Sequence, residues 1–150
     1  MKIILASKSG VRKQILDKYK IDCDVVVSNV DEDQVKESLL AEDASPSIVS
    51  KNLAEIKSVK VSNYHPDKLV LGADSVISLN NVLINKPNSR AEAFQILKKL
   101  NNSKHYLISS VCISKNGSMI WNHSDTSELK MKNLKKTELL EYLSKIRTKT

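Results

Sequence analysis

The segment Leu69–Pro87 constrains the fold of this 150-residue chain more than any other part of it. Its apolar start predicts a buried strand over Lys68–Leu71, which we expect to present Asp74 at its carboxyl end. Ligands of open α/β sheets lie beside that end of the strands. A hairpin is predicted directly afterwards, because Asn80-Asn81 tolerates the positive φ of a tight turn between two apolar runs. We expect this hairpin to return Lys86 to the neighbourhood of Asp74, so that one rigid unit carries a carboxylate and an ammonium.

The start of the chain predicts an anion-binding turn. An apolar strand over Ile3–Ala6 is followed by the polar turn Ser7–Gly10, and helical spacing then gives an apolar stripe of Val11, Ile15 and Tyr19. Ser9 is a suitable N-cap, the free N–H groups of a helix N-terminus attract anions, and Arg12 adds charge there. Neither a Walker loop nor a GxGxxG fingerprint is present, so on the residues alone an ordinary capped helix is favoured.

The rest of the chain alternates strands with helices. Further strands are predicted over Asp24–Val27, Tyr106–Ser114 and Ser118–Lys132, the last two joined by the strong hairpin signal Asn116-Gly117. Helices are predicted from Ser45-Pro46, with Ile48, Val49, Leu53 and Ile56 inside, and from the capping box Ser89–Glu92. A last helix over about Thr137–Ile146 is expected to bury Leu139, Leu140, Leu143 and Ile146. This pattern predicts one α/β domain over residues 1–150 with a mixed sheet.

Composition and charge narrow the classes of function. A hydrophobic content of 41% is typical of a globular protein, and no apolar run approaches the ~20 residues of a membrane span. Cys23 and Cys112 are isolated, which favours two reduced thiols and a cytoplasmic location. The net charge of +7 favours anionic partners, but scattered lysines and 4% aromatic residues do not favour nucleic acid. We therefore expect neither a nucleic-acid nor a membrane partner.

Several segments together resemble the Maf family of nucleotide pyrophosphatases, also called septum-formation inhibitor proteins. The family's opening A-S-x-S-P-R-R pattern is similar to Ala6–Lys13, with Gly10 and Val11 in place of Pro and the first Arg. Further similar elements, in the family's order, are Asp31-Glu32, Leu53–Lys57, Gly72–Ile77, Lys86-Pro87 and Leu100–His105. The resemblance covers essentially the whole chain, but the family continues with a further segment beyond Thr150, so we expect a fragment or a shortened member.

The resemblance implies an elongated mixed sheet flanked by helices, with a cleft between two lobes, similar to the inosine-triphosphate pyrophosphatase architecture. It also implies hydrolysis of the α–β phosphate bond of non-canonical or modified nucleoside triphosphates to a nucleoside monophosphate and pyrophosphate. The family's branches prefer dTTP and UTP or 7-methyl-GTP, and the sequence leaves the base open. A catalytically weak nucleotide-binding or cell-division regulatory protein is the alternative, and a homodimer is possible.

The candidate site residues follow from both arguments. Asp74 is the expected catalytic base and a ligand of Mg²⁺ or Mn²⁺, with Glu32 as the second metal ligand implied by the resemblance. From the residues alone, the turn Asp31–Asp33 reads as a solvated acidic turn. The expected substrate-binding residues are Ser7, Ser9, Arg12, Lys57, Ser75 and Lys86, of which Lys57 depends on the resemblance alone. The two carboxylates are expected to meet in space although 41 residues separate them in the sequence.

Overall fold

The structure is a computed structural model that describes residues 2–145. The elements are β1 (Ile3–Ala6), α1 (Gly10–Lys18), β2 (Cys23–Val25), α2 (Glu32–Ala41), α3 (Pro46–Ser62), β3 (Val70–Leu79), β4 (Val82–Ile84), α4 (Arg90–Leu100), β5 (Lys104–Lys115), β6 (Ser118–Lys130) and α5 (Lys136–Lys145). Within this part of the chain, no helix is both long and apolar enough to cross a membrane.

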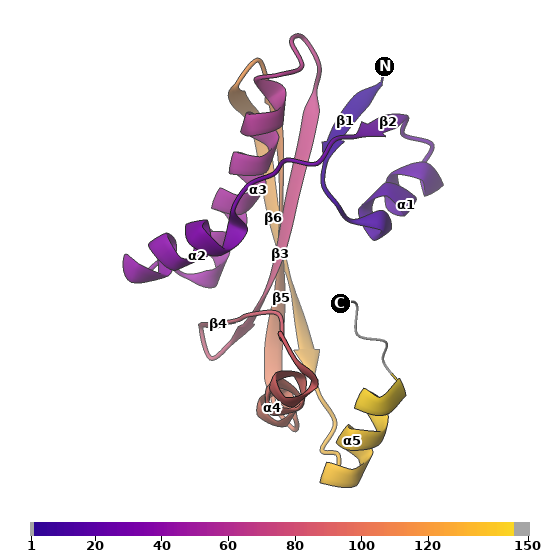
Figure 1. Cartoon of the computed structure of the whole chain (residues 1–150), viewed down its shortest axis with the longest axis vertical. Helices are drawn as coiled ribbons and strands as arrows, with labels where there is room; N and C mark the ends of the chain where they lie inside the picture. Colours follow the sequence, from indigo (N-terminus) through magenta and orange to yellow (C-terminus); the bar gives the residue numbers. More distant parts are fainter. Residues whose placement is uncertain (1, 146–150) are drawn as a thin grey trace.

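Six strands form one mixed sheet in the order β2-β1-β3-β5-β6, with β4 paired to β3. The pairs β1–β2 and β1–β3 are parallel, whereas β3–β4, β3–β5 and β5–β6 are antiparallel. The long strands β3, β5 and β6 connect an upper group of elements that includes α1, α2 and α3 to a lower pair, α4 and α5 (Figure 1). The elongated mixed α/β architecture expected from the sequence is confirmed.

The two predicted hairpins form at the predicted residues. Asn80 and Asn81 both have positive φ, at 51° and 63°, and join β3 to β4. Asn116 and Gly117, with φ of 51° and 82°, join β5 to β6. Positive φ at both central positions is the backbone that a two-residue hairpin requires. Local turn chemistry therefore determines where both antiparallel pairs reverse.

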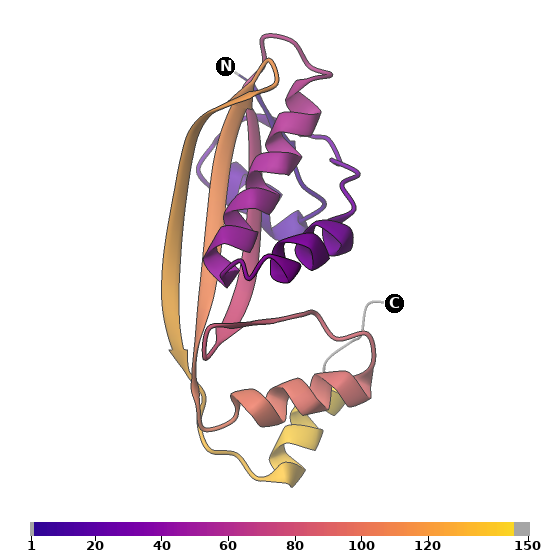
Figure 2. The same cartoon turned by 90° about the vertical axis from the view of Figure 1, so that its left-hand side faces the viewer.

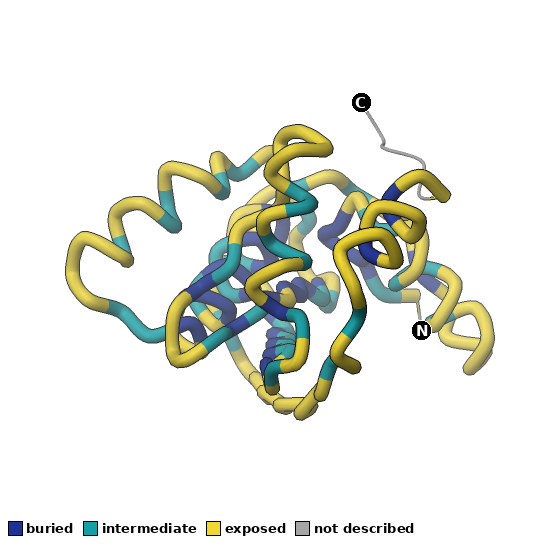
Figure 3. Tube along the Cα trace, turned by 90° about the horizontal axis from the view of Figure 1, so that it is seen from below, coloured by how far each residue is buried: buried dark blue, intermediate teal, exposed yellow. Residues whose placement is uncertain are grey.

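Helix α3 packs along one face of the long strands (Figure 2). It begins as predicted, because Ser45 caps it by accepting from the N–H of Ile48 at 3.3 Å. Its apolar side belongs to two buried clusters, which contain Val49, Leu53, Val76, Leu83 and Ile108 in one and Ile4, Ala6, Val61 and Val70 in the other. The sheet and α3 thus form the core, while the peripheral helices remain mostly exposed (Figure 3).

Small residues allow α3 to approach the sheet closely. A Cβ on Gly72 would lie 2.4 Å from the carbonyl oxygen of Ala54 and 2.8 Å from the backbone nitrogen of Ser58. The hydroxyls of Ser58 and Ser114 meet at 2.7 Å across the same interface, and both residues are fully buried. Glycine is used where another backbone approaches closely. The contact fixes the height of α3 above β3.

Several expectations are wrong. Asp74 does not lie at the end of a short strand, because pairing with β5 from Val70–Ser114 to Ser78–Tyr106 keeps β3 continuous. Leu140 and Ile48 are 47% and 49% exposed, since α5 buries Leu139 and Leu143, and α3 turns Val49 and Leu53 inward instead. Helix α2 was not expected at all. The expected burial of Ile146 lies outside the described residues.

Candidate active site

Strand β3 carries Asp74 onto the face of the sheet that α3 covers. The parallel pairing of β1 with β3 ends at Ala6–Gly72, so Asp74 lies just beyond the carboxyl end of β1. Its side chain is only 9% exposed. The hydroxyl of Ser50, on α3, donates to the backbone carbonyl of Asp74 at 3.0 Å and fixes the strand at this point. The carboxylate therefore occupies a rigid and largely dry position.

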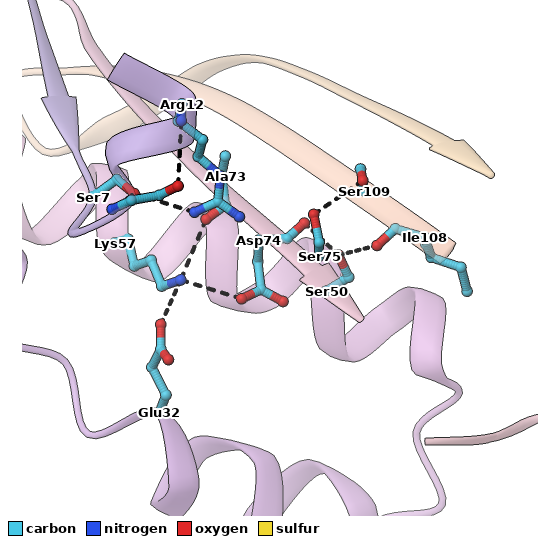
Figure 4. A network of polar contacts seen from close by, with 11 residues as sticks. Ser7, Arg12, Glu32, Ser50, Lys57, Ala73, Asp74, Ser75, Ile108 and Ser109 are labelled. Atoms are coloured by element: carbon cyan, nitrogen blue, oxygen red, sulfur yellow. Dashed lines mark hydrogen bonds and ion pairs between the residues drawn. The ribbon is translucent and has the colours of Figure 1, made fainter. Parts of the chain in front are cut away.

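Lys57 lies at the centre of the site (Figure 4). Its Nζ is 3.2 Å from Asp74 Oδ1, donates to the carbonyl oxygen of Ala73 at 3.3 Å, and forms an ion pair with Glu32. The Lys57 side chain is 8% exposed and that of Glu32 is 37% exposed. An ammonium has three N–H donors, and three oxygens surround this one. Lys57 thus joins the two carboxylates that were expected to meet.

Helix capping places Glu32. Asp31 caps α2 by accepting from the backbone N–H of Gln34 at 3.1 Å, and Glu32 follows in the first turn. Acidic side chains are favourable at that position because the helix dipole is positive there. The signal for this helix was present in the sequence as an Asp cap followed by Val35 and Leu39, which pack against the core. The acidic turn is therefore the start of a helix that presents Glu32 to Lys57.

The two carboxylates have different electrostatic environments. Burial raises the pKa of Asp74 above its ordinary value, and the charge of Lys57 only partly opposes this effect. Burial also raises the pKa of Glu32, but the hydrogen bond and the charge of Lys57, together with the charges of Lys36 and Lys86, outweigh burial there, so the net shift is downward. Glu32 thus stays ionised readily, whereas Asp74 holds a proton more readily than a surface aspartate. Such a split is typical of acid–base sites.

One oxygen of the site has no partner. Asp74 Oδ2 is buried and accepts no hydrogen bond in the part of the chain that the structure describes. Buried polar atoms are nearly always paired, so this oxygen suggests a water or a cation. Carboxylate oxygens are hard donors that suit Mg²⁺ or Mn²⁺. Residues 2–145 contain no cluster of three or more His, Cys, Asp or Glu arranged around a metal, so a divalent ion here needs phosphate or water oxygens as well.

The turn after β1 gathers its polar groups tightly. Ser7 Oγ accepts from Arg12 Nη1 at 3.2 Å and from the N–H of Ser9 at 3.0 Å. Ser9 caps α1 as predicted, because its Oγ accepts from the N–H of Arg12 at 3.2 Å. Figure 4 shows Ser7, Arg12 and Lys57 around the same stretch of β3 as Asp74. Because Ala6 pairs with Gly72, the predicted anion-binding turn follows β1 beside the stretch of β3 that leads to Asp74.

Ser75 and Lys86 differ in how they relate to this site. Neighbouring residues of a strand point to opposite faces, so Ser75 lies on the face opposite Asp74. It is exposed there, and its hydroxyl lies 3.0 Å from that of Ser109. Lys86 makes no hydrogen bond or ion pair within residues 2–145, yet its charge helps to lower the pKa of Glu32. The hairpin thus returns Lys86 towards the acidic pair, whereas Ser75 faces away from Lys57.

Sequence reasoning missed Lys36. Its charge lowers the pKa of both Asp74 and Glu32, although other effects leave the pKa of Asp74 raised overall. Lys36 is four residues after Glu32 on α2, and residues at that spacing share one side of a helix. The signal could be read only once α2 was recognised as a helix.

Comparison with known proteins gives a consistent set of relatives. The Maf-like protein family matches residues 2–149. A nucleoside triphosphate pyrophosphatase of Pelagibacter ubique is 58% identical over 147 residues, which is 98% of this chain and 75% of the relative. A nucleoside triphosphate pyrophosphatase of Ruegeria pomeroyi is 37% identical, covering 95% of this chain and 72% of its own. A 7-methyl-GTP pyrophosphatase of Brucella abortus is 30% identical, covering 97% and 73%.

Solved structures share the fold at low sequence identity. A HAM1 protein from Coxiella burnetii matches with a TM-score of 0.56 at 15% identity, covering 87% of this chain and 72% of its own. A nucleoside-triphosphatase, or dITP/XTP pyrophosphatase, from Mycobacterium abscessus matches with a TM-score of 0.52 at 12% identity, covering 87% and 74%. At such identity these likenesses concern the architecture alone.

Proposed function

The chain belongs to the Maf family, and from this premise we propose that it hydrolyses nucleoside triphosphates to a nucleoside monophosphate and pyrophosphate at the site around Asp74. One observation carries the assignment to this site. Asp74 and Glu32, from elements far apart in the sequence, meet at the buried Lys57 and leave one buried carboxylate oxygen without a partner among residues 2–145. Active sites are where such unsatisfied and perturbed groups gather.

Asp74 is the proposed general base. A base must accept a proton from the attacking water, and Asp74 Oδ2 can do so because no group in the described part of the chain donates to it. Burial raises the pKa of this carboxyl, which makes the carboxylate a better proton acceptor than a solvated aspartate. Lys57 and Ser50 hold the other carboxylate oxygen and the backbone, so the free oxygen has a defined position.

Asp74 and Glu32 would hold a divalent ion such as Mg²⁺ or Mn²⁺. When bound, such an ion would neutralise charge on the phosphoryl oxygens. The donor set fits this role because both residues offer hard oxygen donors, and Asp74 Oδ2, which accepts no hydrogen bond within residues 2–145, has lone pairs for both an ion and the proton of a water. Lys57 lowers the pKa of Glu32 and so favours the ionised form that a metal ligand needs.

The triphosphate would be held by the turn after β1 and by nearby cations. Arg12 is already oriented by Ser7, which lowers the entropic cost of binding a phosphate. Ser9 caps α1, whose N-terminus attracts anions. Lys86 follows the β3–β4 hairpin and would add a second positive charge. Lys57 would reach a phosphate only by releasing one of its three acceptors. Ser75 is the least supported contact, because its hydroxyl lies within hydrogen-bonding distance of that of Ser109.

The cellular compartment and the oligomeric state are proposed from the cysteines and from the edge of the sheet. Cys23 and Cys112 are both free and buried, which suits a reducing compartment such as the cytoplasm. Strand β6 is an edge strand with almost every residue exposed, and it offers the pairing surface for a possible homodimer. No nucleic-acid or membrane partner is proposed.

The decisive experiment is a nucleotide panel. Canonical nucleoside triphosphates, dITP, XTP and 7-methyl-GTP would each be incubated with Mg²⁺ or Mn²⁺, and the products separated by anion-exchange chromatography. We expect equimolar nucleoside monophosphate and pyrophosphate. Release of orthophosphate with a nucleoside diphosphate would place the cleavage at the β–γ bond and contradict the proposal.

A further inference from the structure

The ammonium of Lys57 lies between the two carboxylates of the acidic pair and contacts Asp74 through Oδ1, beside the oxygen proposed for the metal. All three of its N–H donors have acceptors: Glu32, Asp74 Oδ1 and the carbonyl of Ala73. The Lys57 side chain is 8% exposed, so solvent screens its charge weakly. Lys36 adds a second positive charge that acts on both carboxylates. In this state the acidic pair already has its counter-ion.

A divalent ion entering this arrangement meets an unfavourable balance of charge. It gains two carboxylates, but it must approach within a few ångströms of a buried ammonium that contacts both of them. Like charges a few ångströms apart repel strongly where solvent screens them weakly, and a divalent ion feels twice the repulsion of a monovalent one. Mg²⁺ also gives up its water shell reluctantly. The two carboxylates alone are therefore a poor metal site while Lys57 remains in place.

A triphosphate changes this balance. It brings several negative charges and additional oxygen ligands to the same place, beside Arg12 and the Ser7 turn. The negative charges of the phosphates offset the repulsion between Lys57 and the divalent ion. Their oxygens also offer the Lys57 ammonium an alternative acceptor. Lysine suits such an exchange, because it is a point charge on a flexible stem that does not depend on a fixed bidentate geometry.

We propose that Lys57 is the resident counter-ion of the Glu32–Asp74 pair and prevents a divalent ion from binding before the nucleotide. This inference rests on the proposed function, because it takes the acidic pair as the metal site. It assigns Lys57 a positioning role towards the metal that is separate from any contact with phosphate. The metal then arrives with the nucleotide, and the nucleotide-free enzyme stays metal-free at concentrations that saturate the complex.

The test is Mn²⁺ affinity, measured by electron paramagnetic resonance of free Mn²⁺ at pH 8 with and without an α,β-methylene nucleotide analogue. The wild type should bind Mn²⁺ tightly only with the analogue. Lys57→Met should bind Mn²⁺ without the analogue at least about tenfold more tightly than the wild type, given the size of the repulsion removed. Lys57→Arg, which keeps the charge, should bind it as weakly as the wild type.

Further variants show whether a gain in Mn²⁺ affinity arises at the acidic pair. Lys51→Met removes an equal charge from an exposed position of the same helix, and it should change the affinity less than about threefold. Adding Asp74→Asn to Lys57→Met should abolish the gain. A Lys57→Met protein that binds Mn²⁺ no more tightly than the wild type would overturn the inference.

The wild type provides a second measurement that does not depend on the folding of a variant. Mn²⁺ alone should leave its melting temperature unchanged, whereas Mn²⁺ with the analogue should raise it. Stabilisation by Mn²⁺ alone that disappears in Asp74→Asn would overturn the inference but leave the proposed metal site intact. Absence of Mn²⁺ binding even with the analogue would instead contradict the metal requirement of the proposed function, and the inference with it.

Discussion

One face of the sheet is covered by α3, whereas on the opposite face a row of apolar side chains crosses five strands and is exposed at both ends. The pairing registers align these side chains, one from each strand: Val25, Leu5, Leu71, Ile113 and Trp121. Leu5 is buried at 1% exposure, but Val25 and Trp121 are 46% and 49% exposed. On the α3 face, by contrast, Val49, Leu53 and Val70 are fully buried.

The apolar side of helix α1 is exposed, in contrast to that of α3. Its apolar stripe has the spacing of an amphipathic helix, yet Val11, Ile15 and Tyr19 are 65%, 50% and 68% exposed, and none of residues 10–18 is buried. The proposed base and its lysine therefore belong to the tightly packed α3–β3 unit. The proposed phosphate turn belongs to a helix that packing holds less firmly. Chemistry that needs a fixed position is built on the first unit.

The largest expected effect tests the packed unit directly. Asp74→Asn preserves the shape of the side chain but removes the proton acceptor, so turnover should fall by at least ~10²-fold. Steady-state pyrophosphate release measures the loss, and circular dichroism checks that the fold is retained. Asp33→Asn, at an exposed position in the first turn of α2, is the matched control and should stay near wild type.

The pH profile sharpens the same prediction. A base acts when it is deprotonated, and burial raises the pKa of Asp74 above the ordinary value of 3.8. The activity of the wild type should therefore rise with pH on an acid limb that lies above pH 3.8. An Asp74→Asn enzyme with near wild-type turnover would remove Asp74 from the mechanism.

The next effect concerns the height of α3 above the sheet. In Gly72→Ala the new Cβ would meet backbone atoms of Ala54 and Ser58, so the helix must shift, at a cost of about 1–3 kcal/mol in the free energy of unfolding. Urea denaturation measures this cost. Gly10→Ala, on helix α1, is the matched control, because its added Cβ would meet no atom of the described residues within 4 Å outside its chain neighbours and the nearby backbone of its own helix. Equal stability of the two variants would show that the close approach is not important.

A smaller effect is expected at the phosphate turn. Arg12→Ala and Lys86→Ala should each weaken triphosphate binding about tenfold, as expected for loss of a charged hydrogen bond, and monophosphate binding much less. Calorimetric titration with a triphosphate analogue and the matching monophosphate separates the two ligands. Lys8→Ala, an exposed lysine of the same turn, is the control. Equal weakening for both ligands would show that these cations do not hold the outer phosphates.

The smallest effect is expected on the exposed stripe of α1. Ile15→Gln should change the free energy of unfolding by no more than about 0.5 kcal/mol, because its side chain is already half exposed. Leu53→Ala, in the core beneath α3, should cost about 2–5 kcal/mol in the same denaturation experiment. A large loss at Ile15 would mean that the α1 stripe is covered in solution.

The sequence predicts what is decided locally. The Asn80-Asn81 and Asn116-Gly117 turns and the Ser45 cap form as expected, because each depends on residues within a few positions. Which apolar stripe is covered depends on distant elements, so the exposure of Ile15 and Leu140 could not be predicted from spacing. The family resemblance pointed to Glu32, Lys57 and Asp74, which lie together in the structure, but it did not indicate that Lys57 saturates its three donors.

The position of Asp74 within β3 illustrates a second limit. The polar residues Asp74 and Ser75 interrupt an apolar run, which suggested that the strand ended before them. Pairing with β5 continues through both residues, at Asp74–Ser110 and Ser75–Ser109, and keeps the strand extended. Only the partner strand shows that this is one long strand, because a strand's length depends on its neighbours as much as on its own residues.

The arrangement of parallel and antiparallel pairs has a consequence for folding. The β3–β4 and β5–β6 hairpins close over two-residue turns, whereas the β1–β3 pair joins Ile4 to Val70. Contacts of short sequence separation form early, and those of long separation carry the entropic cost of closing a large loop. The Glu32–Lys57–Asp74 contacts require β3 and both intervening helices together. During refolding the hairpins should therefore form first, and the hydrolytic activity should return only when the last long-range contacts have formed.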